Sequence, residues 1–395
     1  MNWLSQIFTV ISFTLRTIPQ RRGAAIAAAF GIAGVVGVLV GVLAIAEGFR
    51  QTMTASATPD VAIVLRSGAD NEMNSGLSRE ETRIISTAPG IALGPNGPLT
   101  SSELFVVISL PKITTGTDAN VPLRGVEPNA FAVRSSIRLV EGRRFELGKN
   151  EIIVGVGASR VFAGLELGKQ IKVGPNLWHV VGLFTAAGGA EESEIWTDAA
   201  VLQPAYQRAD SFQSMFVKLA SPESFTEFKD FLTTNPQVKT KTSKLSDYYL
   251  DQSSQLSEFI TTIGVFIASL MALGALFGAL NTMYGAVAAR TREIATLRAL
   301  GFSSGPVVVS VLAESITLAL VGGVFGATVA YLAFNGYQAS TLNWASFSQV
   351  TFRFAVTPAL LIQAILFAAV LGVLGGLLPA FRAARMPIAQ ALRET

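Results

Sequence analysis

Few residues in this chain could carry out covalent chemistry. It contains no cysteine and a single histidine, His179. Without thiolates there is no cysteine metal site, and one histidine cannot by itself build a histidine metal site. His179 stands in the alternating segment 176–182, so we expect it on a surface or at a strand edge. The sequence therefore predicts neither a catalytic residue nor a metal ligand.

Two glycine-rich segments end in lysine, but neither fits a nucleotide site. Residues 164–169 (GLELGK) are one residue too short for a phosphate-binding loop and precede Gln170, and residues 142–149 have the wrong spacing. The HExxH pattern of zinc proteases is also missing from the sequence. We therefore expect this chain to bind no cofactor, and any ATP that it uses to be hydrolysed by another chain.

Glu314 stands well inside an apolar segment, roughly 14 Å along the helix that we expect there. Intramembrane carboxylates are costly and often functional, for example in proton relays. No second acid or histidine accompanies Glu314 in an apolar segment, which makes a relay the weaker interpretation. We predict a structural or gating role, with polar partners on neighbouring helices: Asn281, Thr282 and Gln363.

Residues 291–301 (TREIATLRALG) combine charge with an apolar stripe between two long apolar segments. Thr291 is a candidate N-cap, and Gly301 can adopt the left-handed conformation that closes a helix. About ten residues make a helix of roughly 15 Å, half of what a bilayer requires, so this helix must lie against one membrane face. The stripe Ile294, Leu297 and Leu300 either docks another protein or packs on the protein's own helix ends.

Composition and charge indicate a membrane protein with one large polar region. Half of the 395 residues are hydrophobic and only 14% are charged. Residues 48–257 are nearly neutral, and the positive excess lies beside the apolar segments, at Arg16, Arg21, Arg22, Arg290, Arg292, Arg298, Arg382, Arg385 and Arg393. The positive-inside rule explains this placement better than nucleic-acid binding does, so we expect no nucleic acid partner and contact with membrane lipid.

The first apolar segment follows an amphipathic stretch. Residues 24–47 are long enough to span a bilayer, and Gly34, Gly37 and Gly41 leave room for a neighbouring helix. The sequence Ala44-Ile45-Ala46 also resembles a signal-peptidase site. We favour an uncleaved anchor because the apolar run is longer than a signal core and a separate amphipathic segment precedes it.

The polar region alternates strand and helix patterns. Ser78 and Glu81 form a capping box, Ala186 to Glu192 is predicted as a mobile loop, and the last stretch fits a βαβ unit. Strands are predicted at 61–66, 104–110, 121–126, 151–156, 170–173, 178–184, 215–219 and 238–242.

The predicted fold is an α+β membrane protein: four transmembrane helices, with a large mixed α/β extracytoplasmic domain inserted between the first and the second. Both termini are then cytoplasmic. The predicted segments are an interfacial helix (1–23), the spans 24–47, 258–282, 305–334 and 357–381, the extracytoplasmic domain (48–257), a cytoplasmic loop (283–304), a short outer loop (335–356) and a C-terminal helix (382–395).

Three stretches together resemble the FtsX-like, MacB-like permease family of ABC transporters. They are residues 292–301, the glycine-rich third span around Gly322, Gly323 and Gly326, and the closing segment 378–393 (LPAFRAARMP to ALR). The resemblance extends more loosely to the first span and to residues 142–145 and 180–182.

This resemblance implies an inner-membrane permease that dimerises and binds two copies of a separate ATPase carrying ATP and Mg²⁺. Nucleotide-driven closure of the ATPases would move a periplasmic domain, which is called mechanotransmission. MacB carries a fused ATPase domain and this sequence shows none, so we expect the split organisation of DevC-like permeases, with a periplasmic adaptor (membrane fusion protein) and an outer-membrane channel. The residues that match the family's coupling helix, and would contact the ATPase, are Arg292, Glu293, Ile294, Leu297 and Arg298.

Efflux or envelope export is the favoured task. Extraction of lipoproteins or lipids and control of a cell-wall hydrolase are alternatives within the same family. An ATP-independent transporter or receptor is a third hypothesis, which predicts polar groups converging in mid-membrane or a signalling domain.

Overall fold

The computed structural model describes residues 22–95, 97–208 and 210–388. These residues divide into two compact units. The helical unit contains the chain up to Glu47, Phe259–Tyr337 and the chain from Phe354, and the mixed unit contains Gly48–Glu258 and Gln338–Arg353. The interfacial helix predicted for 1–23 lies almost wholly outside the described residues, as does the end of the segment predicted for 382–395.

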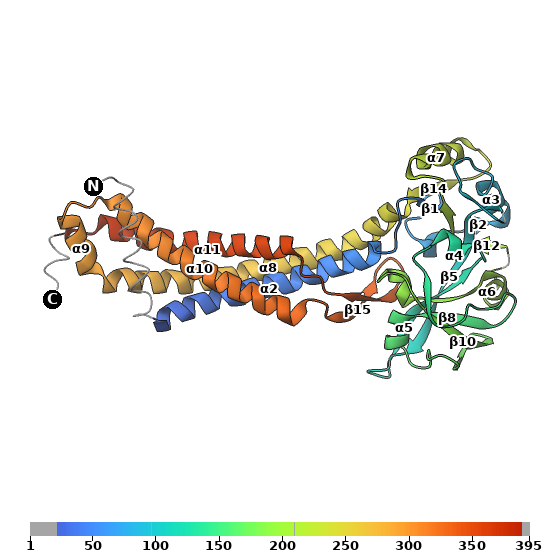
Figure 1. Ribbon diagram of the computed structural model, residues 1–395, viewed down its shortest axis with the longest axis horizontal. Helices are drawn as coiled ribbons and strands as arrows, with labels where there is room; N and C mark the ends of the chain where they lie inside the picture. Colours follow the sequence, from blue (N-terminus) through green and yellow to red (C-terminus); the bar gives the residue numbers. More distant parts are fainter. Residues whose placement is uncertain (1–21, 96, 209, 389–395) are drawn as a thin grey trace. The chain divides into compact units, whose positions relative to one another are not determined.

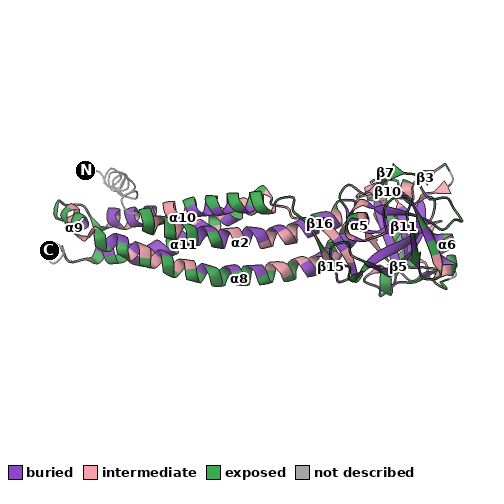
Figure 2. Cartoon of the chain, turned by 90° about the horizontal axis from the view of Figure 1, so that it is seen from below, coloured by how far each residue is buried: buried purple, intermediate pink, exposed green. Residues whose placement is uncertain are grey.

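Four described helices are long and apolar enough to cross a membrane. They are α2 (Arg22–Thr54), α8 (Leu245–Ala289), α10 (Ser304–Phe334) and α11 (Pro358–Arg385). Figure 1 shows their membrane-spanning parts side by side, and their outward surfaces carry exposed apolar side chains, as expected in lipid (Figure 2). At 1.5 Å per residue, the 45 residues of α8 extend to about 68 Å, so α8 is much longer than the span predicted for 258–282.

Glycines bring these helices into backbone contact. A Cβ at Gly322 or Gly326 of α10 would lie 2.3 Å from the carbonyl oxygen of Ala29 or Ala33 on α2. Only glycine permits such an approach, so the GxxxG pair that packs α2 against α10 belongs to α10.

The glycines predicted to mediate packing on the first span behave differently from one another. A Cβ at Gly41 would lie 2.9 Å from the ring of Phe334, and one at Gly37 3.9 Å from the Gly326 carbonyl oxygen. Gly34 is exposed and a Cβ there would meet no atom of the described chain within 4 Å. Gly34 therefore makes no close contact among the described helices of one chain, and its predicted packing role stays a prediction.

The mixed unit is built on one sheet with the strand order β14-β1-β13-β5-β6-β11-β8-β10-β7, with β9 also paired to β10. The bounds of its strands are β1 Val61–Arg66, β5 Thr100–Pro111, β6 Asp118–Val126, β7 Arg138–Gly142, β8 Glu151–Gly155, β9 Gln170–Val173, β10 Asn176–Thr185, β11 Ile195–Asp198, β13 Ser214–Lys218 and β14 Thr240–Lys244. Short pairs are formed by β2 (Leu77–Ser78) with β12 (Ser211–Phe212) and by β3 (Leu93–Gly94) with β4 (Gly97–Pro98).

The long strand β5 pairs with β13 through residues 100–103 and with β6 through residues 104–111. Three apolar cores lie in the described part of the mixed unit: one contains Trp178 and Phe162, one contains Phe228 and Leu77, and one contains Phe184 and Trp196. The helices around them are α3 (Arg79–Ile85), α4 (Ala130–Val133), α5 (Val156–Val161), α6 (Ala199–Ala205) and α7 (Phe225–Thr234), with short 3-10 turns η2 (Glu72–Asn74), η3 (Ala190–Ser193) and η4 (Pro222–Ser224).

Several local predictions are confirmed. The Ser78–Glu81 capping box forms with both of its hydrogen bonds, and β1 and β9 have the predicted bounds. β13 and β14 are both antiparallel to β1 and hence parallel to each other, so β13-α7-β14 is a βαβ unit with β1 inserted between its strands. His179 is exposed on β10, as expected.

The segment predicted as a short outer loop is a β-hairpin. β15 (Gln338–Asn343) pairs with β16 (Ser348–Arg353), and this hairpin belongs to the mixed unit. Its strands were missed because their alternation is weak and polar, with burial on one face only. The mixed unit is therefore assembled from two separate parts of the sequence.

Candidate functional site

The short helix α9 (Thr291–Ala299) connects α8 to α10 as predicted, but it is not capped by Thr291. Arg290 is the N-cap and makes no side-chain cap bond, whereas the Thr291 hydroxyl donates to the Ala288 carbonyl at 2.9 Å. Because only Arg290 separates α9 from α8, the hydroxyl closes the preceding helix. Gly301 has φ +96°, the predicted left-handed closing conformation.

The predicted docking residues divide into an inner and an outer set. Ile294 is buried in a core with Met283, Val307 and other residues of α8, α10 and α11, and Leu297 is half-buried. The guanidinium of Arg298 donates to the Met386 carbonyl at 2.8 Å. Arg292 and Glu293 are exposed, and Leu300 is 74% exposed. The interpretation that the stripe packs on the protein's own helices thus holds for Ile294, while Leu300 remains accessible.

Glu314 is buried, and the guanidinium of Arg290 donates to its carboxylate at 3.3 Å. Two of the partners predicted for Glu314, Asn281 and Thr282, line the same cavity of about 300 Å³, whereas Gln363 is exposed on α11. The sequence did not indicate the ion pair because Arg290 was assigned to the positive-inside cluster. The pair links the start of α9 to α10.

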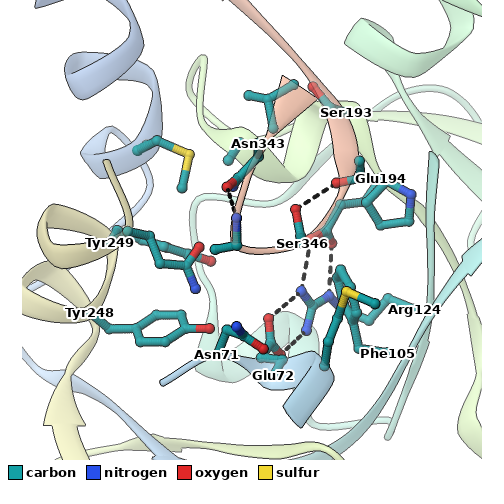
Figure 3. A pocket seen from close by; sticks show the side chains of 18 residues that line it. Asn71, Glu72, Phe105, Arg124, Ser193, Glu194, Tyr248, Tyr249, Asn343 and Ser346 are labelled. Carbon is teal, nitrogen blue, oxygen red and sulfur yellow. Dashed lines mark hydrogen bonds and ion pairs between the residues drawn. The ribbon is translucent and has the colours of Figure 1, made fainter. Parts of the chain in front are cut away.

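A second concentration of charge is buried in the mixed unit and was not predicted. Arg124 of β6 is 1% exposed and contacts three carboxylates, of which Figure 3 shows Glu72 and Glu194. Its guanidinium donates to Glu72 at 2.6 and 3.0 Å, to Glu194 at 2.8 Å twice, and to Glu103 at 3.1 Å. Arg134 also pairs with Glu103. Bidentate geometry of this kind gives strong, oriented ion pairs.

Aromatic rings and further donors complete this ion cluster, which we define as Arg124, Arg134, Glu72, Glu103 and Glu194. The Arg134 guanidinium lies 4.2 Å from the ring of Trp196 and 4.3 Å from that of Phe216. The indole of Trp196 donates to Glu194 at 2.7 Å, and Ser214 donates to Glu72 at 2.6 Å. The cluster therefore satisfies most of its buried polar groups without water.

The pKa values of Glu72 and Glu103 shift in opposite directions. Burial would raise the pKa of Glu72, but Arg124 outweighs burial and holds that pKa below its ordinary value. For Glu103, burial prevails over Arg134 and Arg124 and raises the pKa. Two arginines face three glutamates, so the local excess of negative charge is consistent with this division.

A cavity of about 40 Å³ adjoins the cluster, enough space for a few water molecules. Its wall includes Met53 at the end of α2, Tyr248 and Tyr249 at the start of α8, and Asn343 of the hairpin (Figure 3). Tyr248 is buried, its hydroxyl has no hydrogen-bond partner within the part of the chain that the structure describes, and it points toward Asn71 and Glu72 (Figure 3). The end of α2, the start of α8 and the turn of the hairpin thus all lie beside the cluster.

The family assignment follows from sequence profiles that match most of the chain. Residues 25–234, more than half of the sequence, match the MacB-like periplasmic core domain. Residues 265–388 match the FtsX-like permease C-terminal domain. The chain belongs to the MacB-like, FtsX-like permease family of ABC transporters. The predicted resemblance and fold class are confirmed, and the protein is a multi-pass membrane protein of a family of transport components.

Individual relatives agree with this MacB-like assignment. The chain is 24% identical over 387 residues to the macrolide export ATP-binding/permease protein MacB 1/2 of Paracoccus denitrificans, covering 92% of this chain and 55% of that protein. It is 30% identical over 139 residues to the uncharacterized ABC transporter permease YknZ of Bacillus subtilis, covering 35% of this chain and 33% of that one. The chain therefore spans about half or less of the length of these relatives.

Solved structures of other proteins also align with part of this MacB-like permease. The periplasmic region of MacB from Actinobacillus actinomycetemcomitans aligns with a TM-score of 0.38 and 11% identity, covering 49% of this chain and 92% of that one. The extracellular domain of YknZ from Gram-positive bacteria aligns with a TM-score of 0.35 and 14% identity, covering 46% and 99%.

Proposed function

We propose that this chain is the permease subunit of an ABC transporter that converts ATP hydrolysis by a separate ATPase into movement of its mixed unit in the periplasm. The observation that carries the proposal is the surface of α9. Arg292, Glu293 and Leu300 are exposed on a short helix whose Ile294 is anchored in the helical unit. A partner protein that binds the exposed charges can displace this anchored helix, and the displacement would also move α8 and α10.

Two further observations support this function. The 395 residues contain no phosphate-binding loop, so the proposed mechanism needs ATP and Mg²⁺ to be held outside these residues. The arginines next to α9 and at the end of α11 favour a cytoplasmic position for both, with the mixed unit on the opposite side of the inner membrane. Arg290 at the start of α9 binds Glu314 of α10, so a displacement of α9 would also displace α10.

The proposed assembly contains two copies of this permease and two ATPases. Relatives named as macrolide export proteins favour export as the task, and we propose a periplasmic adaptor and an outer-membrane channel as further partners. Family members that extract lipids or control hydrolases would share the same permease architecture. The gene neighbourhood, through an adaptor gene or a hydrolase gene, separates these tasks.

Co-purification from native membranes tests the proposal. The tagged chain is expected to retain an ABC ATPase and nucleotide hydrolysis, and Arg292→Glu is expected to reduce the bound ATPase at least tenfold because it reverses an exposed charge on α9. Lys229→Glu is the matched control, since it reverses an exposed charge on α7 of the mixed unit. Equal ATPase recovery with both variants would contradict the docking role of α9, and no ATPase with the unaltered chain would contradict the function.

A further inference from the structure

Glu191 in η3 is completely buried and binds two helix ends at once. The Ser56 hydroxyl donates to its carboxylate, with the Ser56 oxygen 2.7 and 2.6 Å from the two carboxylate oxygens. The Tyr249 hydroxyl donates to the same carboxylate at 3.3 Å. Ser56 lies two residues beyond the end of α2, and Tyr249 lies near the start of α8. One side chain therefore joins the two helices that continue into the helical unit.

The segment that carries Glu191 is fixed to the sheet by its backbone. The amide of Gly155, at the end of β8, donates to the Glu194 carbonyl at 2.9 Å. A Cβ at Gly155 would lie 2.2 Å from the carbonyl oxygen of Glu192, so glycine is required for this contact. η3 is therefore held in close backbone contact with the end of the strand β8.

The same segment also holds the hairpin. The Ser193 hydroxyl accepts from the Thr351 amide of β16 at 2.9 Å. Residues 191 and 193 thus bind the segment just beyond α2, the start of α8 and β16, which are three of the four chain segments that continue into the helical unit. An alternative explanation is that Glu191 only shapes its own loop. That role belongs to the neighbouring residue, because the Glu192 carboxylate accepts from Thr185, Ala186 and Gly188 within the loop.

A buried carboxylate is a costly way to fill space. Burial raises the pKa of Glu191, and the nearby Glu194 raises it further, against the smaller opposing effects of Arg134 and Ser56. An apolar side chain would fill the same volume without this desolvation cost. What a carboxylate provides and an apolar group does not is two acceptor oxygens for hydroxyls that come from different helices.

We propose that Glu191 is a positioning residue for transmission: its hydrogen bonds to Ser56 and Tyr249 make η3 the point where movement of α2 and α8 is passed to the sheet. The inference rests on the proposed function. It implies that the start of α8 and the sheet move as one body in every nucleotide state.

Spin labels can test this directly, because the chain has no cysteine of its own. Cysteines replace Leu250 on α8 and Ile113 in the turn between β5 and β6, both of which are exposed. The distance between the labels is measured by pulsed electron resonance in the full complex with its ATPase, with ADP and with a non-hydrolysable ATP analogue. Ser56→Ala with Tyr249→Phe removes both hydroxyls, and Thr185→Val removes the hydroxyl that binds Glu192 as a matched control.

In the otherwise unaltered chain, the distance distribution is expected to stay narrow and the same in both nucleotide states. In the double variant it is expected to broaden or shift with the ATP analogue, while ATPase binding and hydrolysis remain within about twofold, and the Thr185 variant behaves as the unaltered chain does. Single variants at Ser56 and Tyr249 are expected to give intermediate effects.

Two results would overturn the inference: a double variant as narrow and nucleotide-independent as the unaltered chain, or an unaltered chain whose own distance changes with nucleotide. Failure of the ATPase to bind the unaltered chain would instead refute the proposed function. The two failures are therefore distinguishable.

Discussion

Replacing Arg124 by methionine tests whether the ion cluster supports the mixed unit. Methionine keeps much of the side-chain length and removes the guanidinium, so Glu72 and Glu194 lose their bidentate partner and Glu103 retains only Arg134. Breaking a buried ion pair from one side costs about 3–5 kcal/mol, because the remaining charge stays buried. For a domain of this size we expect the unfolding temperature to fall by roughly 6–20 °C.

Tryptophan fluorescence during urea unfolding of the purified chain is a suitable assay. Trp178 and Trp196 are fully buried in the mixed unit, and Trp196 donates directly to Glu194. Arg79→Met is the matched control, because the Arg79–Asp210 pair is mostly exposed and its loss should cost less than about 1 kcal/mol. Loss of less than 1 kcal/mol from Arg124→Met would refute the reasoning.

The pH dependence of the Arg124→Met effect gives a second check. Arg124 holds the pKa of Glu72 below its ordinary value, so this pairing stabilises the fold above the ordinary glutamate pKa and is lost as the pH falls through the lowered value. Without Arg124, burial raises the pKa of Glu72 and its protonation relieves the variant at mildly acidic pH. The difference between variant and unaltered chain should therefore shrink between pH 7 and pH 5, and a difference that grows would contradict the assignment.

Further predictions concern a partly exposed pair and the helix contact. Arg143 lowers the pKa of Glu151 to about 2. After allowance for the half-exposed arginine, Glu151→Gln should therefore lower the free energy of unfolding in urea by about 1 kcal/mol at pH 7 and leave it unchanged near pH 2. Equal losses at both pH values would contradict this pairing. Gly326→Val places a methyl-bearing carbon against the α2 backbone and should lower the unfolding temperature in detergent, whereas Gly34→Val should not; equal effects would disprove the assigned contact.

Local patterns carried the prediction of individual elements well. The alternation in residues 170–173 gave β9, and Ser78 with Glu81 gave the start of α3. β7 was missed because all five of its residues are exposed, so the burial alternation that marks a strand does not appear in its sequence. Pattern recognition works where one face of an element is buried and fails where neither is.

The side-chain pairs of the sites could not be predicted, because their members are far apart in the sequence. Arg290 and Glu314 are 24 residues apart, and Ser56 and Glu191 are 135 apart. Periodicity assigns a residue to a face of its own strand or helix, but it does not say which elements are neighbours, and these pairs depend on that arrangement. A charged residue within an apolar strand, as Arg124 is in β6, was the one local signal that could have indicated the ion cluster.

We propose that ATP binding and hydrolysis on one side of the membrane change the conformation of the mixed unit on the other side. Hydrogen exchange of the permease with its ATPase in lipid nanodiscs, with and without a non-hydrolysable ATP analogue, measures this most directly. We expect altered exchange in α9 and also in residues 190–194 and 245–253. A change confined to α9, with the mixed unit unaffected, would contradict the claim.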